Sequence, residues 1–373
     1  MRSPRVHDVV VVGAGPAGIG VAAALGRAGV RAVLVDRYEV GASFRRWPEG
    51  MRLITPSFTS NQFHQVDLNA ITPETSPALS LTEEHPTGQQ YADYLGLVVE
   101  LEDLHVRTGV DVLDVEPYDD GTLGVLSADG RDLYARHVVW AAGEAQYPRT
   151  NGFRGAERCV PTVQVPAWVD HPGEAAVVIG GYESGIDAAV HLVEAGQRVT
   201  VVDPGEPWNV VDADPSRTLS PYTRGRLRRA YATGRLELVG DARVVEVAPE
   251  ACGFAVATDA GESFHSDGPP LLATGFVGSL AVVRDRFAFD EHGRVEVTES
   301  ADESTVVDNL FLAGPALAHR GAIFCFIYKF RQRFGVVARE ITDRLGYDAA
   351  PLEDLRDHGF LLDDLSCCAD CAC

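Results

Sequence analysis

The sequence predicts an α/β protein with two Rossmann-like dinucleotide-binding domains. The main observation is a repeat: residues 9–36 read VVVVGAGPAGIGVAAALGRAGVRAVLVD, and residues 176–203 read AVVIGGYESGIDAAVHLVEAGQRVTVVD. The offset between the copies is constant at 167 residues, from the first glycine of the turn to the closing aspartate. Each copy has a strand-like apolar run, a glycine-rich turn, a helical pattern and a second apolar run that ends in an acid. Two such units indicate two bound dinucleotides.

The first copy carries the residue types that a dinucleotide pyrophosphate requires. Gly13 permits the tight turn, Gly15 lets the backbone approach the phosphates, and Gly18 lets the helix pack on the strand. Asp36 follows Gly13 by 23 residues, close to the roughly 20 expected for an acid on a ribose 2′-hydroxyl. An ordinary strand–helix unit with packing glycines is the alternative. The residues expected to bind the cofactor are Gly13, Gly15, Pro16, Ala17, Gly18 and Asp36.

The second copy departs from this pattern at its centre. Tyr182 stands where the middle glycine is expected, and a phenol there is predicted to limit the approach of a pyrophosphate. Asp203 closes the unit and favours NADH, because a carboxylate repels the 2′-phosphate of NADPH. An arginine cluster at residues 224–229 could still serve that phosphate, or could form a solvated helix face. The residues expected to bind the nicotinamide coenzyme are Gly180, Gly181, Ser184, Gly185 and Asp203.

Length and charge narrow the class of protein further. The chain has 373 residues, enough for two domains with cores of their own. Its formal charge of −22 argues against nucleic acid and against anionic membrane surfaces as partners. No apolar run reaches the length of a membrane span, and the first apolar run lacks the features of a signal peptide. These observations predict a cytoplasmic protein with no membrane partner.

Three further apolar runs are predicted to be buried strands. Residues 136–141 run on to Gly143, residues 271–275 end at Gly275, and residues 309–314 end at Gly314 before Pro315. An amphipathic helix is expected from residue 323 to residue 345. The chain then becomes acidic and ends in LSCCADCAC.

With these segments the chain resembles the flavoprotein superfamily that includes thioredoxin reductases, bacillithiol-disulfide-reductase-like proteins and flavin-containing monooxygenases, over most of residues 8–345. The resemblance implies FAD at the first fingerprint and NADH or NADPH at the second. It also implies that the nicotinamide domain is inserted in the FAD domain, with junctions at WAAG, which ends at Gly143, and at LATGF, which contains Gly275. Proteins of this superfamily are commonly dimeric, so a homodimer is implied as well. The expected domains are residues 1–146 and 277–345 for FAD, 147–276 for NAD(P)H, and 346–373 as an acidic extension with a cysteine-rich tail.

The last flavin motif of that superfamily ends in Gly-Asp, whose acid contacts the ribityl chain. This chain has Gly314-Pro315 there, so that contact is missing or supplied elsewhere. The N–H groups of residues 316–321 are expected at a helix start, facing the flavin pyrimidine. His319 is either a proton donor beside the flavin or, as we favour, a surface histidine. By analogy Ser60 and Asn61 lie near the flavin, or else form a polar surface turn.

The cysteines suggest the reaction. No CxxC follows the second fingerprint, but four of the seven cysteines lie in the last residues, and Cys368 and Cys371 form a CxxC, a spacing that lowers thiol pKa. We therefore predict electron transfer from flavin to a small-molecule or small-protein thiol or disulfide substrate, through this tail. LSCC resembles the C-terminal cysteine pair of mercuric reductases, which implies a soft metal as another acceptor. The predicted catalytic residues are Cys367, Cys368, Cys371 and Cys373.

Two other readings of the chemistry stay open. The monooxygenase fingerprint FxGxxxH appears as residues 153–159, with Cys159 in place of the histidine, and LATGF resembles the monooxygenase FATGY. This resemblance implies oxygenation of a soft nucleophile. Alternatively, the four tail thiols could bind zinc or Cu(I), or the tail could be an incidental disordered terminus. Cys325 is expected to be a packing residue in a helix.

Overall fold

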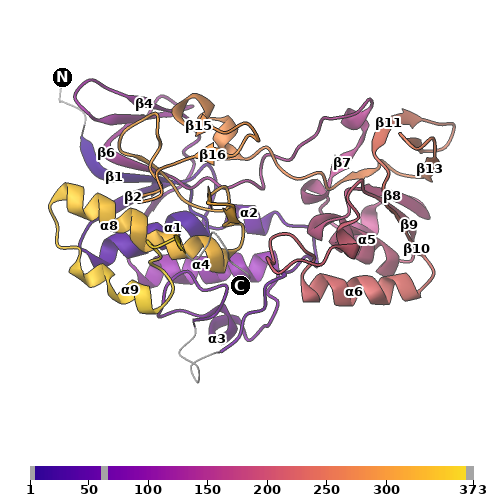
Figure 1. Cartoon of the computed structure of the whole chain (residues 1–373), viewed down its shortest axis with the longest axis horizontal. Helices are drawn as coiled ribbons and strands as arrows, with labels where there is room; N and C mark the ends of the chain where they lie inside the picture. The colour runs from indigo at the N-terminus through magenta and orange to yellow at the C-terminus, as the bar shows by residue number, and fades with distance from the viewer. Residues whose placement is uncertain (1–4, 60–65, 367–373) are drawn as a thin grey trace. The chain divides into compact units, whose positions relative to one another are not determined.

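The computed structural model describes residues 5–59 and 66–366, and it confirms an α/β fold with parallel sheets (Figure 1). These residues form two compact units. The first comprises residues 5–45, 55–146 without the gap at 60–65, and 278–366; the second comprises residues 46–54 and 147–277. Ser60, Asn61 and the four tail cysteines lie outside the described residues. Within the described ranges, no helix has the length and apolar character needed to span a bilayer.

The first unit is built on a seven-stranded sheet. Strands β3, β2, β1 and β6 are parallel neighbours, β17 adds in parallel to β6, and β5 and β4 continue the sheet antiparallel. The valines at 9–12 of β1 are almost fully buried, as expected for a strand covered on both faces. The strands are β1 (Val6–Val12), β2 (Ala32–Val35), β3 (His105–Arg107), β4 (Val112–Pro117), β5 (Leu123–Ser127), β6 (Leu133–Trp140) and β17 (Leu310–Leu312).

Helix α1 of this unit packs closely on α8. A Cβ atom on Gly20 would lie 1.9 Å from the ring of Phe334, so the glycine is required for the contact between these helices. Helix α4 begins at a capping box, in which Thr87 and Gln90 each accept a backbone N–H of the other. The helices are α1 (Pro16–Arg27), α2 (Ala42–Arg45), α3 (Pro77–Leu81), α4 (Gly88–Leu101), α7 (Ile327–Phe330), α8 (Phe334–Leu345) and α9 (Asp354–Asp357).

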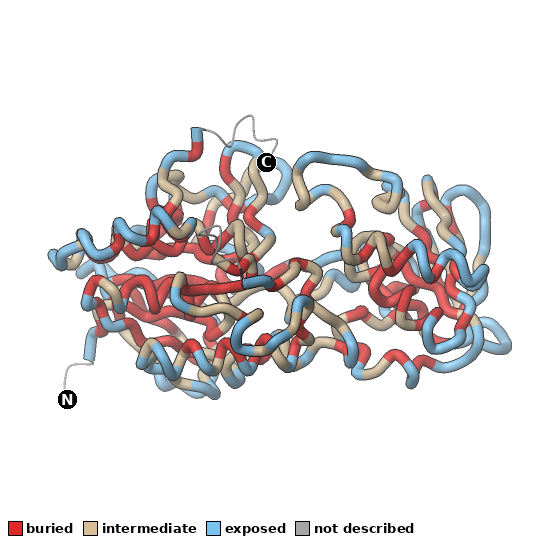
Figure 2. The backbone as a smooth tube through the Cα atoms, turned by 90° about the horizontal axis from the view of Figure 1, so that it is seen from below, coloured by how far each residue is buried: buried red, intermediate tan, exposed pale blue. Residues whose placement is uncertain are grey.

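The second unit has a five-stranded parallel sheet in the order β10, β9, β8, β14, β7, and a three-stranded antiparallel sheet. The central strands β8 and β14 of the parallel sheet are almost entirely buried, and α5 contributes more buried apolar residues to the surrounding core than any other element. Figure 2 shows the buried segments in red and the exposed ones in pale blue. The elements are β7 (Val160–Pro161), β8 (Ala175–Ile179), α5 (Glu183–Glu194), β9 (Arg198–Val202), α6 (Pro221–Ala232), β10 (Leu236–Val239), β11 (Val244–Pro249), β12 (Phe254–Thr258), β13 (Ser263–Ser266) and β14 (Leu271–Leu272).

The segment after β17 differs from the expectation of a helix that starts near residue 316 and an amphipathic helix that begins at 323. One short hairpin, β15 (Ala288–Phe289) with β16 (Val295–Glu296), precedes β17 in the chain, and a second, β18 (Ala318–His319) with β19 (Ala322–Ile323), follows it. Arg320 (φ 49°) and Gly321 (φ 86°) both have positive φ, which makes the second hairpin's turn and excludes a helix there. Helix begins only at Ile327.

Two single-residue expectations on this segment are also wrong. Cys325 lies ahead of α7 and is exposed, so it is not a packing residue inside a helix. His319 is 7% exposed, so it is not a surface histidine.

A buried ion pair joins α5 to α6 in the second unit. The guanidinium of Arg226, which is 7% exposed, donates a hydrogen bond to Asp187 and lies 3.0 Å from Nε2 of His191. Arg224 donates to the carbonyl of Val210 and to Thr218. Two of the four clustered arginines are therefore committed to internal partners, which does not fit a phosphate-binding cluster. Arg228 and Arg229 are exposed.

Removing one partner of this pair should destabilise the second unit. Arg226→Met leaves the buried Asp187 carboxylate without its arginine and with only His191, 3.6 Å away, as a partner, and we expect a loss of about 3–5 kcal/mol in the free energy of unfolding of this unit. Urea unfolding followed by tryptophan fluorescence, to which Trp168 stacked on His191 contributes, measures it. Arg229→Met on the same helix is the control and should change stability by less than about 0.5 kcal/mol. Equal stability of the two variants would contradict this account.

Candidate functional site

The two glycine-rich turns are held by the same hydrogen bond. Asp36 accepts the N–H of Ala14 at 2.8 Å through Oδ2, and Asp203 accepts the N–H of Gly181 at 2.7 Å through Oδ2. The other oxygen of each acid accepts a backbone N–H two residues further on, at 2.8 Å in the first unit and 2.7 Å in the second. Each carboxylate thus fixes its turn to the end of the second strand. We call this arrangement the carboxylate clamp.

The first and third glycines of each turn are required by the protein itself. Gly13 and Gly180 have φ of 114° and 103°, and a Cβ atom on them would lie 2.3 and 2.4 Å from a backbone oxygen of the neighbouring strand's end. A Cβ on Gly18 or Gly185 would lie 1.9 or 1.8 Å from the carbonyl oxygen of the first glycine. No side chain fits at these four positions.

The middle position of the turn is different, because nothing in the first unit requires a glycine there. Gly15 has φ −91° and ψ −174°, which any residue adopts, and its Cβ would meet no atom within 4 Å. Tyr182 has almost the same backbone, with φ −85° and ψ −163°. The first turn therefore keeps a space open at the N-terminus of α1, where free N–H groups favour an anion.

Tyr182 uses the corresponding space in the second unit for a contact with the protein. Its hydroxyl donates to the carbonyl of Thr218 at 3.0 Å. The next residue, Glu183, accepts the backbone N–H of Ser220 and the hydroxyl of Thr223, and burial raises the pKa of this carboxyl. The second turn thus also anchors the loop that leads into α6.

A pocket of about 630 Å³ lies beside the second turn, entirely within the second unit. It is at the C-terminal ends of the parallel strands β8, β9 and β14, where open α/β sheets bind ligands. The predicted residues Gly180, Ser184, Asp203 and Gly275 line it, together with Tyr182. Gly181 lies behind the turn, packed against Trp208 and Asp203. Of the five predicted coenzyme residues, the structure places Gly180, Ser184 and Asp203 at this pocket, whereas Gly181 and Gly185 do not line it.

The first unit gathers its predicted residues at the corresponding edge of its sheet. Strands β1, β6 and β17 are parallel, so the residues that follow them, at Gly13, Gly143 and Gly314, meet at one edge. A Cβ atom on Gly314 would lie 3.4 Å from that of Ala17, which places Gly314 and Pro315 against the first turn.

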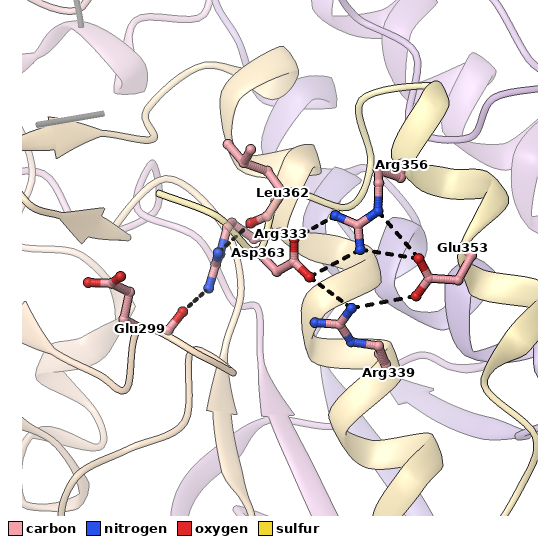
Figure 3. Close-up of polar contacts among 7 residues, drawn as sticks. All are labelled: Glu299, Arg333, Arg339, Glu353, Arg356, Leu362 and Asp363. Atoms are coloured by element: carbon pink, nitrogen blue, oxygen red, sulfur yellow. Dashed lines mark hydrogen bonds and ion pairs between the residues drawn. The ribbon is translucent and has the colours of Figure 1, made fainter. Parts of the chain in front are cut away.

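A buried acid that sequence reasoning missed lies next to this edge. Asp302 is fully buried and accepts hydrogen bonds from Nε of Arg333 at 2.9 Å and from Nε2 of His319, 2.6 Å away. Arg333 also donates to the carbonyls of Leu362 and Glu299 (Figure 3). These contacts span 17 to 34 residues of sequence, so no local pattern marks them. The arginines in the apolar stretch FIYKFRQRFG were the only signal.

The acidic extension is docked on α8 as far as the structure describes it. Asp363 accepts hydrogen bonds from Arg339 at 2.9 Å and from Arg356 at 2.5 Å, as Figure 3 shows. The bond from Arg356 holds the pKa of the Asp363 carboxyl well below its usual range, and the bond from Arg339 adds to this. The N–H of Leu362 donates to the carbonyl of Gln332. The extension is thus part of the first unit's packing.

The cysteines of the described residues do not form a redox pair. Cys159, Cys252 and Cys325 make no disulfide within the described ranges. Cys159 is buried, and burial raises the pKa of its thiol to about 12, so it stays protonated at neutral pH. Nor do the described residues contain a cluster of His, Cys, Asp and Glu able to hold a metal ion. The predicted catalytic cysteines of the tail are outside the described residues.

Two parallel-sheet units with paired glycine turns define an enzyme class, the two-dinucleotide oxidoreductases. The family profile of pyridine nucleotide-disulphide oxidoreductases matches residues 10–314, and the chain belongs to this family. The enzyme is therefore an FAD-dependent pyridine-nucleotide oxidoreductase.

Similar proteins come from two functional groups. Bacilliredoxin reductase Bdr of Bacillus subtilis is 24% identical, over 91% of this chain and 98% of its own. The structure of the bacillithiol disulfide reductase from Staphylococcus aureus has a TM-score of 0.74 at 20% identity, over 91% of this chain and 99% of its own. In the other group, rice indole-3-pyruvate monooxygenase YUCCA1 is 27% identical, over 54% of this chain and only 48% of its own. A flavin-containing monooxygenase from Stenotrophomonas maltophilia has a TM-score of 0.73 at 20% identity, over 91% of this chain and 98% of its own.

Gly15→Ala separates binding of FAD from folding. Because the added Cβ meets no protein atom, we expect the free energy of unfolding without cofactor to change by less than about 0.5 kcal/mol. We expect the affinity for FAD to fall at least about tenfold, since a methyl group enters the space kept for a pyrophosphate. Fluorescence titration with FAD measures this. Gly26→Ala, also in open space, is the control and should leave FAD affinity unchanged; an unchanged affinity in Gly15→Ala would place the pyrophosphate elsewhere.

Proposed function

We propose that this enzyme passes electrons from NADH or NADPH through FAD to a disulfide or thiol-bound acceptor, with the C-terminal cysteines as the relay. The position of the cysteines in the chain is the observation that supports a relay through the tail. The described residues contain no disulfide, Cys159 is held protonated in a core, and four cysteines follow directly after the docked extension. Cysteines that lie close enough in sequence to form a redox pair are found in that tail.

The residues of the first unit fit FAD. Gly13, Gly15 and Gly18 leave the N-terminus of α1 open to the pyrophosphate, with Pro16 and Ala17 in the same turn, and Asp36 fixes the turn. Gly143, Gly314 and Pro315 line the same edge of the sheet. FAD, when bound, supplies the acceptor of a hydride and the donor of two electrons. The protein's part is to place and orient it.

The pocket of the second unit fits the nicotinamide coenzyme. Its lining includes Gly180, Ser184, Asp203 and Gly275, and the N-terminus of α5 opens onto it. The overall reaction with a disulfide is NAD(P)H + H⁺ + RSSR → NAD(P)⁺ + 2 RSH, so two electrons pass and one proton is taken up. The names of the relatives from Bacillus subtilis and Staphylococcus aureus support a small-protein or small-molecule disulfide as RSSR.

The likeness to monooxygenases favours a second candidate, oxygenation of a soft nucleophile with O₂ as co-substrate. Cys159, which replaces the histidine of the monooxygenase fingerprint, is buried and protonated, so it offers no equivalent proton exchange. A tail that binds zinc or Cu(I) is the third candidate. For each of these candidates we place the protein in the cytoplasm, where thiols are normally reduced. The expected homodimer is tested separately, by size-exclusion chromatography.

Counting thiols before and after reduction tests the relay. We expect anaerobic NADPH or NADH to bleach the flavin and then to release two further titratable thiols per tail disulfide. Serine replacement of Cys367, Cys368, Cys371 and Cys373 should remove these thiols and the turnover of a disulfide substrate. Cys252→Ser is the matched control and should change neither.

An unchanged thiol count on reduction would contradict the relay. Oxygen-dependent product formation by the serine variant would support the monooxygenase. Bound zinc or copper that disappears in the same variant would support a metal-binding tail.

Cys159 should behave differently from Cys252 in the folded protein. Its pKa of about 12 leaves almost no thiolate at pH 8, whereas Cys252 is exposed. We expect iodoacetamide at pH 8 to modify Cys252 and to leave Cys159 unmodified until the protein is unfolded. Peptide mass spectrometry distinguishes the two sites, and rapid native labelling of Cys159 would show that its site is open.

A further inference from the structure

The coenzyme pocket has an adenosine end that can be recognised from the sheet. In a doubly wound unit the adenosine lies beyond the C-terminal end of the second strand, here β9. The N–H of Asp203 at this end donates to the carbonyl of Val239, the last residue of β10. Arg243, which precedes β11, lines the pocket with Asp203 and Pro204. The adenosine ribose would therefore lie between Asp203 and Arg243.

The charge of Asp203 is already engaged by the protein. Both of its oxygens accept backbone N–H groups, from Gly181 and Gly205, in the same arrangement that Asp36 has in the first unit. Because this carboxylate clamp appears in both units, an acid at this position is explained by the turn alone. The presence of Asp203 therefore loses its value as a signal for NADH.

The charge of Arg243, in contrast, is available. Its backbone N–H donates to Asp259, but within residues 5–59 and 66–366 its guanidinium has no hydrogen bond or ion pair. The chain after Asp203 reads Pro-Gly-Glu-Pro and has no base, and Arg224 and Arg226 are occupied elsewhere. Arg149, the other arginine of the pocket, lies beside Gly275 and Phe276, away from β9.

We propose that Arg243 binds the 2′-phosphate of the adenosine ribose and makes NADPH the preferred coenzyme. This inference rests on the proposed role of the pocket as the nicotinamide-coenzyme site. Arginine binds phosphate through charge-assisted, often bidentate hydrogen bonds. In a chain with a formal charge of −22, an arginine that the described residues leave without a carboxylate partner attracts such an anion specifically.

Two mononucleotides that differ only in the 2′-phosphate test the proposal without any turnover. We would titrate the purified flavoprotein with adenosine 2′,5′-bisphosphate and with 5′-AMP by calorimetry. We expect the bisphosphate to bind roughly tenfold to a hundredfold more tightly, as one charged hydrogen-bonded contact provides. Arg243→Gln should abolish the difference by weakening the bisphosphate alone, and Arg243→Lys should restore part of it. Arg229→Gln, in the exposed part of the α6 cluster, should keep the full difference.

The failures are distinguishable. Equal affinity of the two nucleotides for the unaltered protein, or an unchanged difference in Arg243→Gln, would overturn the assignment of Arg243 and leave the pocket as a dinucleotide site. Loss of the difference in Arg229→Gln would move the phosphate to α6 and overturn it as well. Binding of neither nucleotide would overturn the proposed role of the pocket itself.

Discussion

The carboxylate clamp is the constraint on which both units depend. A glycine-rich turn has free N–H groups and little side-chain packing, so it needs an external group to fix it. Asp36 and Asp203 supply that group from the end of the adjacent strand, each across 22 residues. The first and third glycines are then forced by the backbone oxygens around them. Turn, helix start and strand end form one rigid corner in each unit.

The two corners differ in how they use the space in front of the helix. The first leaves it open at Gly15. The second fills it with Tyr182 and, through Tyr182 and Glu183, holds the loop before α6. That Tyr182 limits the approach of a pyrophosphate stays a prediction; in the structure its hydroxyl donates a hydrogen bond to the carbonyl of Thr218. The second corner thus lines a ligand pocket and also holds the loop before α6 in place.

The two turns and the strands around them could be predicted because places where two backbone segments come very close require glycine, which is visible in the sequence. Contacts that exclude any side chain make Gly13, Gly18, Gly180 and Gly185 visible at fixed spacing, and the strands around them follow from apolar runs. Long-range polar contacts leave no such record, so Asp302 with its partners His319 and Arg333 could not be found. The hairpin at residues 318–323 was missed for a local reason. Arg320 also adopts a positive φ, and an arginine in the sequence does not indicate that conformation.

The docking of the acidic extension has a consequence for how the terminal thiols can be studied. Residues 346–366 supply the carbonyl of Leu362 to the buried Arg333, and the carboxylate of Asp363 to Arg339 on α8. A truncation at the end of α8 would leave a buried guanidinium short of an acceptor, beside the acid that holds His319. Inactivity of such a truncated enzyme would report a damaged fold and would carry no information about sulfur chemistry. Chemistry at the terminus has to be probed atom by atom, with the chain length preserved.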